Sequence, residues 1–155
     1  MIGRTAQAIY CDDIRTELGG KNSFMGVYET EMVIPAFPIT LPKLCAQLKL
    51  LLPKGKMPNS IRFMLLSDDS VMAEALLTEE QLHQHPPPQP AAGIPIEDFS
   101  IGIVAMFAFA PVTFEKPTTL KVRIYADDEE IKGNSLRVRI ATESEASAMG
   151  FISPE

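Results

Sequence analysis

Two stretches near the C-terminus alternate apolar and polar residues with a period of two, and this pattern limits the fold more than any other feature. In "TLKVRIYA" (119–126), leucine, valine and isoleucine take one side while lysine, arginine and tyrosine take the other. "SLRVRIA" (135–141) repeats the pattern. A period of two is that of a half-buried β-strand. The two runs predict a hairpin, joined through "DDEEIKGN" with an irregular return at Gly133 and Asn134.

Further runs of strand length lie upstream. Residues 43–52, 60–66 and 71–77 are apolar and bounded by proline, glycine or "SDDS", which form turns. The run at 71–77 is also rich in helix formers, and "TEEQ" after it is a capping box at Thr78. "FSIGIVAMFAFA" (99–110) is apolar on both faces, which predicts a central strand covered on both sides.

The N-terminal part predicts a second hairpin. Apolar residues alternate over 6–10 and again over 24–28, and Gly19-Gly20-Lys21-Asn22 between them suits a reversal with positive φ. Asp-Asp pairs occur at 12–13, 68–69 and 127–128, each beside an apolar strand. Because aspartate bonds nearby backbone N–H groups, we expect these pairs to serve turns and strand ends.

These patterns predict an all-β fold, a two-sheet β-sandwich of immunoglobulin-like or C2-like type with about seven to nine strands. The 13 prolines favour many short elements over long helices, although one short helix is allowed near residues 78–83. The 155 residues suit a single domain, 1–155. A proline-rich loop is expected at 83–95 and a polar C-terminal tail at 142–155.

Charge and hydropathy exclude some classes of partner. A net charge of −6 argues against general nucleic-acid binding, which needs excess lysine and arginine. Neither a signal peptide nor a membrane span is expected, because no apolar run is long enough. Because neither segment is expected, the protein is expected in the cytoplasm. Cys11 and Cys45 lie in apolar runs, so we expect buried free thiols.

Common catalytic motifs are missing: there is no phosphate-binding glycine loop, nucleophile elbow, HExxH or paired CxxC. We therefore expect a protein that is not an enzyme and has no cofactor. His83 and His85 could share one face of an extended segment as metal ligands, but two ligands are too few. A calcium-binding sandwich, or a metal-dependent hydrolase that uses the Asp pairs, stays open as an alternative.

One surface favours binding of a protein partner. An aromatic side chain among basic ones is typical of interface hot spots, and a basic stripe suits an acidic partner. The candidate residues on the last hairpin are Lys121, Arg123, Tyr125, Arg137 and Arg139. The alternative is a solvated face, partly offset by Glu115, Glu129 and Glu130. A homodimer through an edge strand is a further use of exposed sheet.

The stretch "CDDIRTELGGKNSFMGVYE", followed by "FPITLPKLC", resembles the opening of a family of small bacterial and phage proteins of uncharacterised function. The C-terminal half is similar in style to the last strands of immunoglobulin-like or C2-like sandwiches. The resemblance implies a phage- or prophage-encoded protein that acts by binding, for example to a host factor or defence component in the bacterial cytoplasm. A role as a virion or assembly component is the alternative. The family resemblance implies no catalytic residue.

Overall fold

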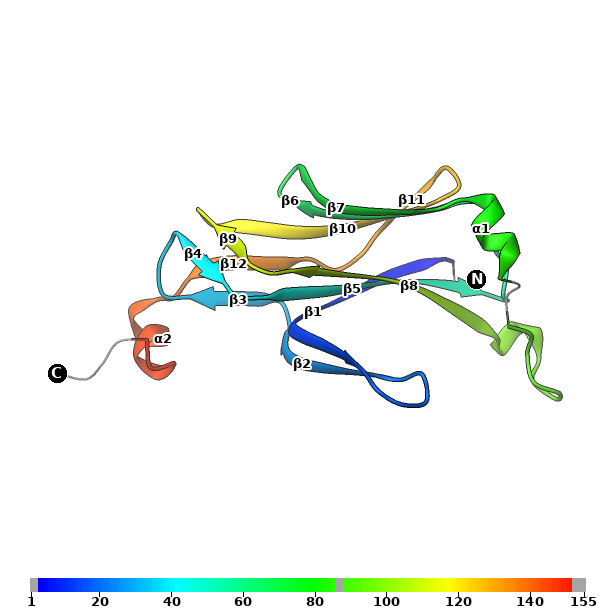
Figure 1. Cartoon of the computed structure of the whole chain (residues 1–155), viewed down its shortest axis with the longest axis horizontal. Coiled ribbons are helices and arrows are strands. Elements are labelled where there is room, and N and C mark those ends of the chain that lie inside the picture. The colour runs from blue at the N-terminus through cyan, green and yellow to red at the C-terminus, as the bar shows by residue number, and fades with distance from the viewer. Residues whose placement is uncertain (1–2, 86–87, 152–155) are drawn as a thin grey trace. The chain divides into compact units, whose positions relative to one another are not determined.

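The computed structural model describes residues 3–85 and 88–151, and the chain is all-β with a sandwich-like architecture (Figure 1). The strands are β1 (Thr5–Thr16), β2 (Asn22–Tyr28), β3 (Glu31–Ile34), β4 (Ile39–Leu41), β5 (Leu44–Pro53), β6 (Ile61–Ser67), β7 (Ser70–Leu77), β8 (Ser100–Phe109), β9 (Val112–Phe114), β10 (Thr118–Ala126), β11 (Glu129–Lys132) and β12 (Leu136–Ile140). The helical elements are α1 (Glu79–Gln84), the 3-10 turn η1 (Ile96–Asp98) and α2 (Glu143–Ala148). The all-β prediction is confirmed. The described strands outnumber the expected seven to nine because β3, β4, β9 and β11 are only three or four residues long.

The strands form three sheets. A four-stranded sheet has the order β2-β1-β5-β8, and a two-stranded sheet pairs β4 with β9. The six-stranded sheet runs β3-β12-β10-β6-β7, with β11 also paired to β10. The expected hairpin at the N-terminus and the strands at 43–52, 60–66 and 71–77 are all present, as β1–β2, β5, β6 and β7.

The chain divides into two compact units, which are described separately. Unit 1 comprises Met1–Ala8, Gln47–Phe107 and Lys121–Asn134, and unit 2 comprises Ile9–Ala46, Ala108–Leu120 and Ser135–Glu155.

In unit 1, alternation along β6 and β10 builds the core. Ile61, Phe63 and Leu65 on β6 are fully buried, as are Val122 and Ile124 on β10. The hairpin predicted from 119–126 and 135–141 is only partly present, because β10 changes partner along its length. Residues 123–126 pair with β11 in unit 1, whereas residues 118–120, which belong to unit 2, pair with β12. The segment "DDEEIKGN" contains a strand of its own, since its Ile131 is buried where β11 pairs with β10.

In unit 2, the β1–β2 hairpin turns through Gly19 and Gly20, whose φ values of 85° and 75° confirm the expected positive-φ reversal. β3 pairs in parallel with β12. The tail expected from residue 142 begins with a helix: Thr142 caps α2, and Glu145 completes a capping box. A threonine followed three residues later by glutamate is a helix start signal that the sequence contains. Residues 152–155 of the tail lie outside the described part.

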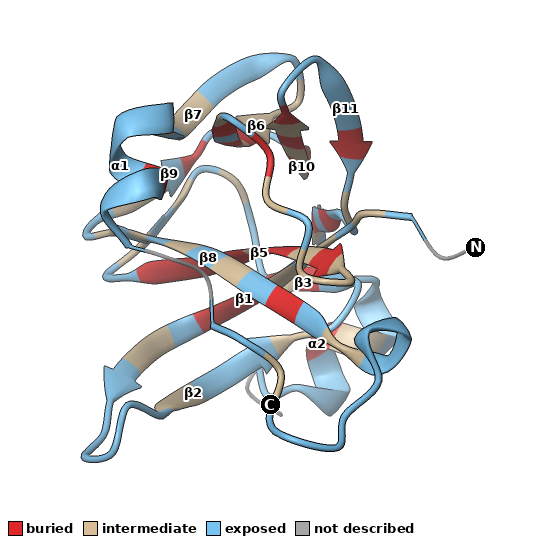
Figure 2. Ribbon diagram, turned by 90° about the vertical axis from the view of Figure 1, so that its right-hand side faces the viewer, coloured by how far each residue is buried: buried red, intermediate tan, exposed pale blue. Residues whose placement is uncertain are grey.

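β8 corrects a second expectation. The sequence predicts a central strand over 99–110, yet β8 ends the four-stranded sheet. Figure 2 shows the contrast between β5, which is largely buried, and β8, which is mostly exposed or half-buried. Val104 and Met106 are exposed by 39% and 46%. The apolar composition of a strand indicates that its side chains can be buried. It does not indicate whether both edges of the strand are paired with neighbouring strands.

The helix predicted near 78–83 is confirmed as α1, where Thr78 and Gln81 form the capping box. Two of the three Asp pairs lie in turns as expected, with Asp68 and Asp127 at φ values of 52° and 53°. The first pair does not, because Asp12 and Asp13 lie inside β1. The predicted proline-rich loop at 83–95 begins within α1, and its residues 86–87 are outside the described part.

Candidate functional site

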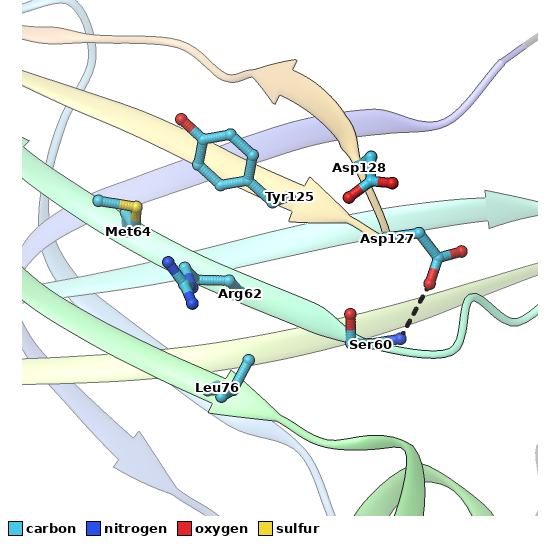
Figure 3. A pocket seen from close by; sticks show the side chains of 7 residues that line it. All are labelled: Ser60, Arg62, Met64, Leu76, Tyr125, Asp127 and Asp128. Carbon is cyan, nitrogen blue, oxygen red and sulfur yellow. Dashed lines mark hydrogen bonds between the residues drawn. The ribbon is translucent and has the colours of Figure 1, made fainter.

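A groove of about 520 Å³ lies on unit 1 (Figure 3). Its floor and sides come from β6, β7 and β10, and its end comes from the β10–β11 turn. The lining residues are Ser60, Arg62, Met64, Leu76, Tyr125, Asp127 and Asp128. All of them belong to unit 1.

Strand alternation directs these side chains outward. Arg62 and Met64 alternate with fully buried Ile61, Phe63 and Leu65, so they project from the opposite face of β6. Tyr125 likewise lies between buried Ile124 and Ala126 on β10, which is the neighbour of β6. Leu76, directly opposite Arg62 in the β6–β7 register, is 48% exposed.

Arg62 and Tyr125 have no hydrogen-bond or ion-pair partner among the residues that the structure describes. The Arg62 guanidinium therefore keeps its five N–H donors for solvent or for a bound carboxylate. The Tyr125 hydroxyl can donate or accept, while its ring and the side chains of Met64 and Leu76 offer apolar contact. The groove can thus bind a group that places an anionic atom near Arg62 and apolar atoms against Tyr125, Met64 and Leu76.

The acidic end of the groove has a structural role. Oδ1 of Asp127 accepts from the backbone N–H groups of Asn59 and Ser60 at 2.8 and 3.1 Å. The backbone N–H of Asp127 donates to the carbonyl of Ser60 at 3.0 Å. Asp127 therefore ties the β10–β11 turn to the start of β6, as Figure 3 shows for its contact with Ser60. Asp128 is exposed beside it.

The five residues predicted to bind a partner are divided between the two units. Lys121, Arg123 and Tyr125 lie on β10 within unit 1, and only Tyr125 lines the groove. Lys121 Nζ lies 3.6 Å from Asp69, and Arg123 Nε lies 3.4 Å from Glu130. These ion pairs offset the charge of the two basic side chains.

Arg137 and Arg139 lie on β12 within unit 2. Arg139 donates to Glu31 and, through both terminal nitrogens, to Glu145 at 2.8 Å. These hydrogen bonds raise the pKa of the Arg139 guanidinium and hold the pKa of Glu145 at about 2. Arg139 therefore attaches α2 to β12 and β3. Arg137 is exposed, and no side-chain partner is found for it among the described residues.

The two histidines considered as metal ligands do not share an extended segment. His83 is in the last turn of α1, and His85 is the C-cap of that helix. In the described part of the chain, no three side chains of His, Cys, Asp or Glu gather as a metal site would require.

The first Asp pair supports the N-terminal hairpin. Asp12 accepts a hydrogen bond from Tyr28, whose pKa is raised by burial and by that carboxylate. Asp13 pairs with Lys43 at 2.7 Å, which lowers the pKa of its carboxyl. Neighbouring residues on a strand point to opposite faces, so the two acids have separate partners.

The sequence interpretation selected Tyr125 but missed Arg62, Met64 and Leu76. The run "SIRFMLL" does place Arg62 and Met64 on the face opposite Phe63, so alternation could have identified them as outward-facing. Nothing in the sequence indicates that β10 neighbours β6, which brings Tyr125 beside them.

The thiols of Cys11 and Cys45 are free and buried, as expected. In the described residues no helix is long and apolar enough to cross a membrane.

Among curated proteins, no significant match to this chain is found. A family match covers residues 6–139, which confirms the resemblance to an uncharacterised family. The chain belongs to the family of unknown function DUF6941.

Proposed function

We propose that this protein is a non-enzymatic protein-interaction module, and that its partner binds in the groove formed by Arg62, Met64, Leu76 and Tyr125. The observation that carries the proposal is an arginine with no partner in the described part of the chain, beside a tyrosine and two exposed or half-exposed apolar side chains. Tyrosine and arginine are the side chains that dominate interface energetics, and methionine is enriched at interfaces.

The groove favours a protein partner over a catalytic role. Of its two carboxylates, Asp127 is engaged by two backbone N–H groups and Asp128 is exposed to solvent. The described residues that line the groove include no histidine or cysteine that could activate a nucleophile. Its arginine suits an acidic or carboxylate-bearing side chain of the partner. The free thiols suit a reducing compartment, so we place this interaction in the cytoplasm.

The experiment is affinity capture from the source cell, followed by titration of the purified partner against variants. Arg62→Glu and Tyr125→Ala are each expected to weaken binding by at least about 10-fold, because each removes a hot-spot contact. Arg137→Glu is the matched control: it has the same charge change at an exposed arginine of unit 2. It is expected to leave binding unchanged.

Loss of binding in Arg137→Glu, with full binding in Arg62→Glu and Tyr125→Ala, would assign the partner surface to β12 instead. Untagged protein should also be assayed for bound metal and for turnover in a broad hydrolase screen. Stoichiometric metal together with turnover would overturn the non-enzymatic proposal.

A further inference from the structure

β8 has the composition of a central strand but the position of an edge strand. Its ten residues contain no charge and no proline. Exposed edge strands usually carry charges, bulges or prolines that prevent pairing with another chain. A long edge without such devices is a template for a further strand.

The other end strands of the two larger sheets have protective features that β8 lacks. β2 contains Gly26 at a φ of 66°, which interrupts regular strand geometry. β3 has only four residues and begins with Glu31. β7 carries Glu74 and a register shift opposite Leu65 and Leu66. In the described chain, the backbone hydrogen bonds outside the sheets reach Phe99 but none involves residues 100–109.

We infer that β8 pairs with β8 of a second copy in an antiparallel arrangement centred on Ala105, making a symmetric dimer with one continuous sheet. Residues directly opposite in an antiparallel pair point to the same side of the sheet. Inward-facing residues of β8 have odd numbers and outward-facing residues even numbers, so the symmetry axis must pass a residue rather than a peptide bond.

The register centred on Ala105 matches side chains by size. On the outward face, Val104 lies opposite the partner's Met106, and Gly102 lies opposite the partner's Ala108. On the inward face, Ile103 lies opposite the partner's Phe107, and Ile101 lies opposite the partner's Phe109. Pairs of aromatic and β-branched residues stabilise antiparallel strands, and no like charges face one another.

A cavity in unit 1 also supports pairing with a second copy of the chain. It measures about 430 Å³ and is lined by Ile101, Ile103, Val104, Leu77, Leu82 and Met57, with Gln81, His85, Pro88 and Gly102 at the remaining sides. The proposed register places the partner's phenylalanines opposite Ile101 and Ile103, which border this cavity. Apolar aromatic side chains therefore have a preformed apolar space beside them.

The test introduces charged residues at two exposed positions of β8, Val104 and Met106. The wild type is expected to be a dimer by multi-angle light scattering, at twice the chain mass of 17.0 kDa. In the double variant Val104→Glu, Met106→Glu, each interface contains glutamate opposite glutamate twice. The dimer dissociation constant should rise by at least about 100-fold.

The variant Val104→Lys, Met106→Glu changes the same positions but places lysine opposite glutamate, so it should dimerise. Met25→Glu, Val27→Glu on β2 is the matched control, because these residues are exposed by 45% and 46% on the other edge of the same sheet. It should stay dimeric, and circular dichroism should show the β-rich spectrum for all variants.

A monomeric wild type at high micromolar concentration would overturn the inference. So would a dimer that survives the two glutamates, or one that the β2 variant dissociates. Hydrogen exchange gives an independent readout: amides of residues 100–109 should gain protection as protein concentration rises, and absence of that gain would contradict the pairing. Arg62→Glu should remain dimeric, so failure of this inference is distinguishable from failure of the proposed partner groove.

Discussion

The Tyr28 hydroxyl donates a 2.6 Å hydrogen bond to Oδ1 of Asp12 across the β1–β2 hairpin. Gly26 lies between them in sequence and takes a φ of 66°. A Cβ at position 26 would lie 2.2 Å from Oδ2 of the same carboxylate. Asp12 from "CDD" and Gly26 and Tyr28 from "GVY" thus lie together across the hairpin.

Gly26→Ala should destabilise the protein by about 3 kcal/mol, because it combines backbone strain with a clash against Asp12. Gly19→Ala is the matched control, since Gly19 has a φ of 85° and nothing lies within 4 Å of the position that a Cβ would take there. It should cost about 1 kcal/mol, the contribution of the left-handed conformation alone. Urea unfolding measures both, and equal losses would contradict the contact with Asp12.

Tyr28→Phe should lower the free energy of unfolding by about 1 kcal/mol, because Asp12 loses a hydrogen-bond donor. Tyr125→Phe provides the comparison, since the Tyr125 hydroxyl has no partner among the described residues. It should change stability by less than about 0.5 kcal/mol. Chemical denaturation measures the stability of both variants. Equal denaturation midpoints for Tyr28→Phe and Tyr125→Phe would show that the Tyr28 hydroxyl does not stabilise the fold.

Docking of α2 should weaken in acid. The pKa of Glu145 is lowered to about 2 in the folded protein by its hydrogen bonds with Arg139 and Thr142, and the ordinary value is 4.5. A lowered carboxyl pKa contributes stability above the unfolded value and loses it as the pH falls from 4.5 towards 2. Hydrogen exchange of residues 143–148 should therefore accelerate over that range.

Glu145→Gln should abolish most of this acid dependence, because glutamine does not titrate. Glu143→Gln, in the first turn of the same helix, should keep it. Identical pH profiles for the two variants would show that Arg139 and Glu145 do not hold the helix.

Cys11 should resist alkylation in the folded protein. Burial, together with nearby Cys45 and Asp12, raises the pKa of its thiol to about 11, so the reactive thiolate is scarce near neutral pH. Mass spectrometry after iodoacetamide treatment in mildly alkaline buffer should find both cysteines unmodified in the native protein and modified in urea. Comparable labelling of the two samples would contradict their burial.

Local patterns in the sequence determined much of this protein. Alternation identified β10, and apolar runs bounded by turn-forming residues identified β5, β6 and β7. The glycine pair identified the first reversal, and the capping box at Thr78 identified α1. Each of these signals depends on residues within a few positions of one another, because strand and helix periods are local properties of the backbone.

Tertiary structure alone decided which strands are neighbours. In the folded chain the second half of β10 pairs with β11, and β8 lies at a sheet edge despite its apolar composition. The same topology brings Arg62 beside Tyr125. Strand order depends on contacts between residues far apart in the chain, and the same alternating pattern is compatible with several pairings. The groove and the proposed dimer edge therefore follow from sheet topology, although their strand residues point as the strand period requires.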